Sequence, residues 1–425
     1  MIAVSPRTVR LPVVRSTRTI AEFSCTGCGS CCEQGYDVPV ERAIYDGLMA
    51  AAAGLPALEA RRWQGGLEVT HLDGKDDYAR LRQRDGGACV FLDGDRLCAI
   101  HKLLGAEAKP FACRAFPMAV SQLPTELVAT TLTFLCEPLV DALAGGRREA
   151  SGTSAMEVPC ADGTHAVLHG ALAEARVFPL GERAAVAVAA WPLLEARVRE
   201  ILQVRGAPFA GRLLFAHAWL GEIAAASSSA GVPADGAAIT RAWSAVPPRR
   251  LRDRARGAAS AKADLTRTVA VLDAVGARGL GGFVAPHPVR EALPAIRAWA
   301  GFSPGARAEA WARMRRERLA LTPKARDAMR EKYAVNRWLG SWAPPMLGAR
   351  HALLVVAVAL ALGEWIALVE AERAGAAIDA PRFARALAIA DEWVLHAAAA
   401  MPALATAALD WATDARTLHA LVRTD

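Results

Sequence analysis

Cysteine is concentrated near one end of this chain. Eight of the nine cysteines in 425 residues lie between residues 25 and 136, and the ninth is Cys160. The densest stretch, FSCTGCGSCCEQ, holds four thiols within eight residues. Thiols this close together either form disulfides or bind metal, so they constrain the fold of the whole N-terminal region.

The cellular compartment decides between those outcomes. The start of the chain lacks the apolar stretch and cleavage site of a secretory signal, and the longest apolar run, ALLVVAVALAL at 352–362, is too short to span a bilayer. We therefore expect a cytoplasmic protein with no membrane partner, whose thiols are metal ligands or reactive groups. The net charge of +7 comes with no basic block interleaved with aromatics, so nucleic acid is not an expected partner.

In the first cysteine run, Cys25, Cys28 and Cys31 have the C-x2-C-x2-C spacing of iron–sulfur ligand runs. The intervening glycines permit a loop that turns tightly around a metal. Cys32 differs, because the side chains of neighbouring residues tend to diverge. We expect Cys31 and Cys32 to point apart, so that they join different centres or one of them ligates nothing.

The second run, GGACVFLDGDRLC, places Asp93-Gly94 between two apolar segments, which is a strong signal for a two-residue hairpin turn. That turn predicts that Cys89 lies opposite Cys98 in a non-hydrogen-bonded pair, with Cβ atoms roughly 4.5–5.5 Å apart. Two thiols so placed suit one metal centre; a cross-strand disulfide is the lesser alternative.

Two single cysteines follow, Cys113 and Cys136. Each alone is more often a small core residue, but together with the other six they are candidate ligands. Cys160 is given no role. His101 is a weaker candidate, since a surface or core histidine is the commoner case, and Arg114 could offset thiolate charge or simply be solvated.

The pattern of apolar residues predicts a mainly α protein. Apolar residues recur every three or four positions after residue 180, whereas short alternating pieces precede residue 140. We expect a small loop-rich cysteine-cluster metal-binding domain with a β-hairpin at 1–143, a linker at 144–165 and an α-helical domain at 166–425. The predicted helices of the last part cover 184–204, 211–226, 262–277, 306–321, 327–342, 351–373 and 381–401.

The order of FSCTGCGSCC, CVFLDGDRLC and CRAFP resembles the cysteine-cluster family of zinc- or iron-chelating domains, over about residues 23 to 136. A closer resemblance is to the flagellin lysine N-methylase family, carried also by TLTFLCEPL and the downstream EKYAVNRWLGSW. The second resemblance implies methyl transfer from S-adenosylmethionine to the surface lysines of a flagellin-like protein partner. The ligand roles then pass to Cys25, Cys28, Cys31, Cys32, Cys89, Cys98, Cys113 and Cys136.

Catalytic residues and a cofactor-binding site stay unassigned. A Rossmann-type methyltransferase needs a Gly-rich loop between a strand and a helix, and the candidate VGARGLGGF at 275–283 follows a helical stretch instead. The matching motifs include Glu137, Tyr333, Asn336 and Trp338, for which helix packing or capping is an equally good account.

Three hypotheses follow. The first is a protein-lysine N-methyltransferase with one or two iron–sulfur ([4Fe–4S]) clusters, or zinc. The second is a non-enzymatic or redox metal-cluster protein whose helical domain binds a partner, and the third is a structural zinc module on a helical scaffold. Zinc and iron–sulfur clusters both accept all-cysteine ligation, and the C-x2-C-x2-C run favours iron.

Overall fold

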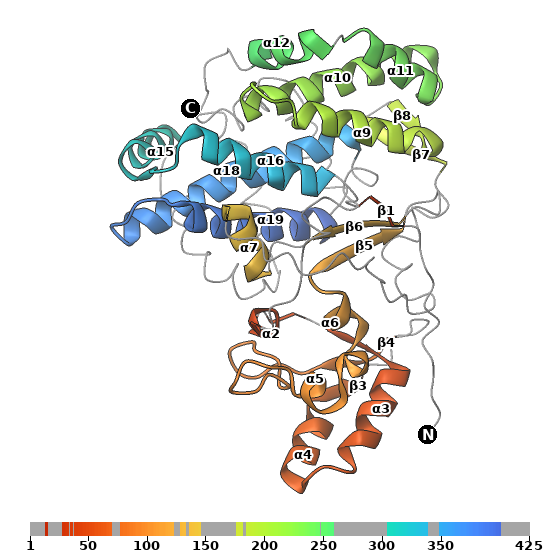
Figure 1. Ribbon diagram of the computed structural model, residues 1–425, viewed down its shortest axis with the longest axis vertical. Helices are drawn as coiled ribbons and strands as arrows, with labels where there is room; N and C mark the ends of the chain where they lie inside the picture. The colour runs from red at the N-terminus through yellow and green to blue at the C-terminus, as the bar shows by residue number, and fades with distance from the viewer. Residues whose placement is uncertain are drawn as a thin grey trace.

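Helices dominate the structure, as the sequence predicts. The part of the chain described by the computed structural model contains fourteen α-helices and eight short strands, six of them before residue 133 (Figure 1). The described residues are 13–15, 28–33, 35–36, 38–69, 77–122, 128–132, 136–145, 176–181, 184–246, 248–258, 304–338 and 348–400.

The N-terminal region is built on a small antiparallel sheet. Its strands lie in the order β2 (Pro39–Glu41), β4 (Asp77–Leu81) and β3 (Leu67–Val69). Two helices contact the sheet, α3 (Arg42–Ala52) and α4 (Ala57–Gly65). Trp63 and Phe91 meet edge to face in the core of this region, with ring centroids 5.5 Å apart.

A second sheet and a short helix connect this region to the rest of the protein (Figure 1). The sheet has the order β1 (Val13–Arg15), β6 (Val128–Leu132) and β5 (Met118–Gln122), with β1 parallel to β6 and β5 antiparallel to it. Helix α7 (Glu137–Ala144) follows, and its Leu139 and Leu143 pack into the core of the later helices.

The later helices begin and end at residues suited to those positions. Asp235 caps α11, accepting a 2.7 Å hydrogen bond from the backbone N–H of Ala238, and Gly231 ends α10 with φ 65°. The helices are α9 (Trp191–Leu202), α10 (Phe209–Ala230), α11 (Gly236–Ser244), α12 (Pro248–Ala258), α15 (Pro304–Arg318), α16 (Pro323–Trp338), α18 (Ala349–Arg373) and α19 (Ala380–Ala400).

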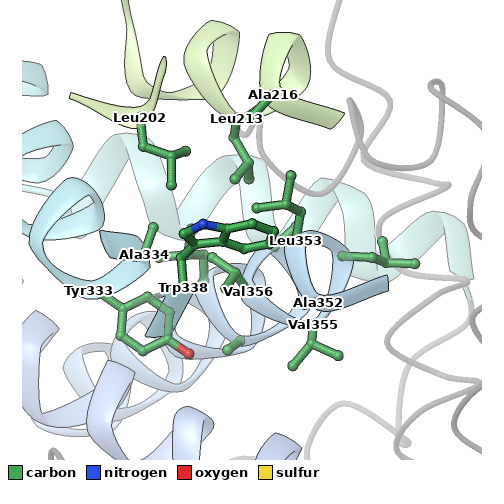
Figure 2. Close-up of a cluster of buried hydrophobic side chains, with 14 of the residues drawn as sticks. Leu202, Leu213, Ala216, Tyr333, Ala334, Trp338, Ala352, Leu353, Val355 and Val356 are labelled. Carbon is green, nitrogen blue, oxygen red and sulfur yellow. The ribbon is translucent and has the colours of Figure 1, made fainter. Parts of the chain in front are cut away.

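Helix α18 is the centre of the helical core. Within the described ranges it is the one helix long and apolar enough to cross a membrane, yet its most apolar 18-residue window is completely buried inside the protein. Figure 2 shows Trp338 of α16 amid Leu202 of α9, Leu213 of α10 and Val356 of α18. The predicted burial of the 352–362 run is therefore confirmed.

The structure corrects one predicted helix. Residues 184–187 do not begin the helix predicted over 184–204; they form strand β8 (Ala184–Ala187), antiparallel to β7 (Val177–Gly181), and the helix starts only at Trp191. Alternate residues of β8 are buried, a period of two that the alanine-rich sequence also allows. The helix predicted at 262–277 lies outside the described residues, and the domain boundaries stay predictions.

Candidate metal centre

The first cysteine run forms a single helical turn, α2 (Ser30–Glu33). The backbone N–H of Cys32 closes the turn on the carbonyl of Gly29, at 2.8 Å. Gly29 has φ 75°, and a Cβ at this position would lie 2.4 Å from the carbonyl oxygen of Arg96. Only glycine fits here, so the sequence CGSCC brings Cys31 and Cys32 directly against the second cysteine run.

Arg96 fastens that turn with its side chain. Its Nε donates a hydrogen bond to the carbonyl oxygen of Cys28 at 2.9 Å, and its Nη2 forms an ion pair with Glu33 at 2.9 Å. Its own backbone is left-handed, with φ 64°. Arg96 lies two residues before Cys98 in the second motif, but the cysteine spacing alone does not reveal its role.

The predicted register of the second run is wrong. Leu92, not Cys89, lies opposite Cys98, and Cys89 is bridged to Gln83. The turn has three residues between Asp93 and Leu97 rather than two, with Arg96 in the left-handed position typical of such loops.

Side-chain contacts explain the longer loop. Asp93 accepts a hydrogen bond at 2.8 Å from Arg62 of α4 and one at 3.0 Å from Lys102. Lys102 also reaches Asp95 at 2.7 Å, so both acidic residues of the turn are held by cations that lie outside it.

Short helices carry the other thiols. Cys98 is the N-cap of α5 (Ala99–Leu104), Cys136 is the N-cap of α7, and Cys113 lies within α6 (Phe111–Ala115). The backbone N–H of Cys89 donates to the carbonyl of Cys32 at 2.7 Å, joining the two motifs directly.

The structure gathers five thiols into one group, in which each interacts electrostatically with at least two others: Cys31, Cys32, Cys89, Cys98 and Cys113. Cys136 lies near Tyr36, which is also near Cys31. Cys28 begins the loop, held through its carbonyl, and Cys25 lies outside the described residues.

The adjacent thiols do not point apart as predicted. Cys31 and Cys32 are hydrogen-bonded to each other, which lowers the pKa of Cys31 to about 7. The same bond, together with burial and the charge of Cys31, raises the pKa of Cys32. Alternation across a chain is a property of strands, whereas successive side chains in a helical turn are only about 100° apart.

Cations lie around the thiol group. Lys109 lowers the pKa of Cys31, and Arg84 and Arg62 act in the same direction on Cys89, although burial raises the pKa of Cys89 more strongly. Arg114 instead pairs with Glu107 at 3.0 Å. Positive charge near several thiols is what a centre made of thiolates requires.

The residues fit a thiolate-bound metal in their chemistry. All the clustered donors are sulfur, the ligand type of structural zinc and of iron–sulfur clusters. In the described part of the chain no three His, Cys, Asp or Glu side chains are already arranged to hold one ion, and two of the thiols are hydrogen-bonded to each other instead. His101 is exposed on α5.

The thiol group lies against the helical region. Ser30 donates a 2.6 Å hydrogen bond to Glu137 of α7, a residue 107 positions away. Burial raises the pKa of Tyr36, and the charge of Glu392 on α19 raises it further. Glu137 and Tyr36 therefore bring the cysteine loop and the later helices together.

The downstream motif is used for packing. Tyr333 donates a 2.7 Å hydrogen bond to Asp391, and Trp338 donates one at 3.2 Å to the carbonyl of Glu195. Both side chains and Asn336 are buried. These contacts agree with helix packing, one of the two accounts open from the sequence.

The family CxxCxxCC, described as a "putative zinc- or iron-chelating domain", matches residues 24–137. All eight candidate cysteines lie within this domain, and the match ends at Glu137, which accepts the hydrogen bond from Ser30. No curated protein and no solved structure matches the chain. The match supports a metal-binding protein of the zinc- or iron-chelating kind.

Proposed function

We propose that the protein transfers methyl groups from S-adenosylmethionine to lysine side chains of a partner protein, with an iron–sulfur or zinc centre in its CxxCxxCC domain. The observation that carries the metal part is the gathering of five thiols from four segments under nearby cations. The resemblance of the cysteine motifs and of EKYAVNRWLGSW to flagellin lysine N-methylases supports the reaction.

The ligands we propose are Cys31, Cys32, Cys89, Cys98 and Cys113, together with Cys25, Cys28 and Cys136 from the flanks of the group. A bound iron–sulfur cluster would supply a redox-active centre, and bound zinc a structural one. Arg96 and Ser30 hold the loop of the first run in place. Lys109, Arg84 and Arg62 offset the charge of the thiolates.

The proposed reaction moves one methyl group. The sulfonium C–S bond of S-adenosylmethionine breaks, an N–C bond forms with the neutral amine of lysine, and the sulfur keeps the electron pair. The products are S-adenosylhomocysteine and a methylated ammonium, so one proton is released overall, and it leaves the lysine ammonium before attack.

The test uses protein purified without oxygen. Iron and sulfide in a coloured protein favour an iron–sulfur centre, whereas colourless protein with stoichiometric zinc rejects it. Labelled S-adenosylmethionine and a lysine-rich partner such as flagellin should then place label on lysine. Absence of both S-adenosylmethionine binding and label transfer in metal-replete protein would reject the methylase proposal and leave the metal site standing.

One observation favours the second hypothesis, a non-enzymatic or redox metal protein whose helices bind a partner. Tyr333, Asn336 and Trp338 of the downstream motif are buried and engaged in packing, so they are not free to touch a substrate. Under this hypothesis, the metal-replete protein should capture a partner protein but transfer no label to it.

A further inference from the structure

The N-terminal end of α18 packs against both α10 and β7. Gly348 has φ 96°, and a Cβ there would lie 3.4 Å from both the carbonyl oxygen of Pro179 and Nδ1 of His351. The guanidinium of Arg350 covers Gly221 of α10, where a Cβ would lie 3.6 Å from Cζ. The aliphatic part of the Arg350 side chain lies beside Gly181 of β7, where a Cβ would be 4.0 Å from Cδ of Arg350.

The buried imidazole of His217 lies on the face of α10 that Arg350 covers. His217 precedes Gly221 by one turn of α10, so the two residues share a helix face. His217 is only 2% exposed, and Nε2 has no hydrogen-bond partner in the described structure. Burial, with the charges of Arg350 and His351, lowers its pKa to about 3.

These basic side chains meet the positive end of a 25-residue helix. The helix dipole and the first backbone N–H groups attract anions and oppose cations at this position. A buried polar atom without a partner costs folding free energy, and in the Nε2–H tautomer of the neutral imidazole a bound anion removes that cost by accepting the hydrogen bond. The Arg350 guanidinium and the unpaired buried nitrogen of the neutral His217 imidazole, placed at a helix N-terminus, match the needs of an anion.

A groove lies next to the N-terminal end of α18. Its volume is about 450 Å³, and its wall shares Pro179 and Gly181 with the contacts of the α18 terminus. The other lining residues are Val177, Ala184, Ala185, Ser227, Gly231, Val232 and Pro233. The groove can hold a small apolar group, because the one hydroxyl on its wall, that of Ser227, already donates to the carbonyl oxygen of Val232 at 2.6 Å.

We propose that the N-terminus of α18, Arg350 and His217 bind the carboxylate or phosphate group of a small molecule, whose apolar remainder lies in the groove beside β7. The site belongs to the helical region and does not depend on the proposed methyl transfer. It gives this region a ligand of its own, apart from the thiol group.

Calorimetric titration of the whole metal-replete protein with inorganic phosphate and with hexanoate tests the site, with chloride at equal ionic strength as the reference. We expect one of the two to bind in a saturable manner and to weaken by at least about tenfold in Arg350→Gln, the loss expected for a charge-assisted contact. Tighter binding of phosphate assigns a phosphate ester, and tighter binding of hexanoate assigns a carboxylate with an apolar tail.

Arg241→Gln, on the exposed face of α11, is the matched control and should bind as the wild type does. If Arg350→Gln fails to fold, Arg350→Lys should retain binding and His217→Gln should weaken it severalfold. In the wild type the ¹⁵N resonance of His217 Nε2 should shift on titration. Binding no tighter than chloride, or equal loss in Arg241→Gln, overturns the proposal.

Discussion

Gly29 approaches Arg96 so closely that the two cysteine motifs can meet only through a glycine. A Cβ would lie 2.4 Å from the Arg96 carbonyl oxygen, and φ is 75°. Gly29→Ala should therefore separate α2 from the second run and lose most of the metal bound by wild-type protein purified without oxygen. Metal analysis per chain measures this.

Gly94→Ala is the matched control in the same motif, because a Cβ there meets nothing within 4 Å. It should keep its metal. Equal metal content in Gly29→Ala and Gly94→Ala would show that the contact between the two runs does not build the centre.

Cys32 lies inside the thiol group, within electrostatic reach of Cys31, Cys89 and Cys98. Cys32→Ser should lower the metal content, by roughly half if two four-thiolate centres share the Cys31-Cys32 dipeptide. The comparison is Cys160→Ser, which removes the one cysteine outside the motifs and should leave the metal content unchanged. A wild type with a single centre that survives Cys32→Ser intact would contradict the division between two centres.

The helical part of the fold was predictable because its signals are local. Helix α18 follows from its apolar composition and length, which the sequence alone displays. Strand β8 was missed since its pairing with β7 is tertiary, and an alanine-rich segment fits either helix or strand.

The approach of the two cysteine runs to each other was predictable, but the register of the second run was not. Asp93-Gly94 favours a two-residue turn by local rules, yet Arg62, 31 residues earlier, and Lys102 hold Asp93 in a longer one. The Cys31–Cys32 contact was missed for a related reason, because the helical turn of α2 depends on the distant Arg96.

Glu364 should contribute strongly to the stability of the helical core. It is fully buried on α18, where it pairs with Arg330 at 2.8 Å and Arg315 at 3.2 Å. Glu364→Gln leaves those arginines without their carboxylate, and we expect the free energy of unfolding in urea to fall by about 3–5 kcal/mol.

Glu372 on the same helix provides the comparison. It is about a third exposed and pairs with Arg318 at 2.8 Å, so solvent screens the pair and Glu372→Gln should lower the free energy of unfolding far less than Glu364→Gln does. Similar losses in both variants would mean that burial does not set the strength of these pairs.

Gly363 lies where α18 and α19 pack closely together. A Cβ on Gly363 would lie 2.9 Å from the Cα of Leu387, so Gly363→Ala should destabilise the protein by about 1–3 kcal/mol despite the better helix propensity of alanine. Gly47→Ala in α3, where a Cβ meets nothing within 4 Å, should instead stabilise by up to about 1 kcal/mol. Thermal unfolding of both variants checks the pair, and a gain in Gly363→Ala would show that the two helices can move apart freely.

His217 should make the helical core sensitive to acid. Burial, aided by Arg350 and His351, lowers its pKa from 6.5 to about 3, so the imidazole stays neutral in the folded state while the unfolded chain takes up a proton. This contribution to stability is complete above pH 6.5 and is lost as the pH falls toward 3. Linkage gives a loss of about 3 kcal/mol in the free energy of unfolding between pH 8 and pH 4.

Urea denaturation in phosphate-free buffer measures this loss. Between pH 8 and pH 4, the free energy of unfolding of His217→Gln should fall by about 3 kcal/mol less than that of the wild type. The control His101→Gln, exposed on α5, should follow the wild type. Parallel curves for His217→Gln and wild type would mean that the imidazole is not held neutral in the core.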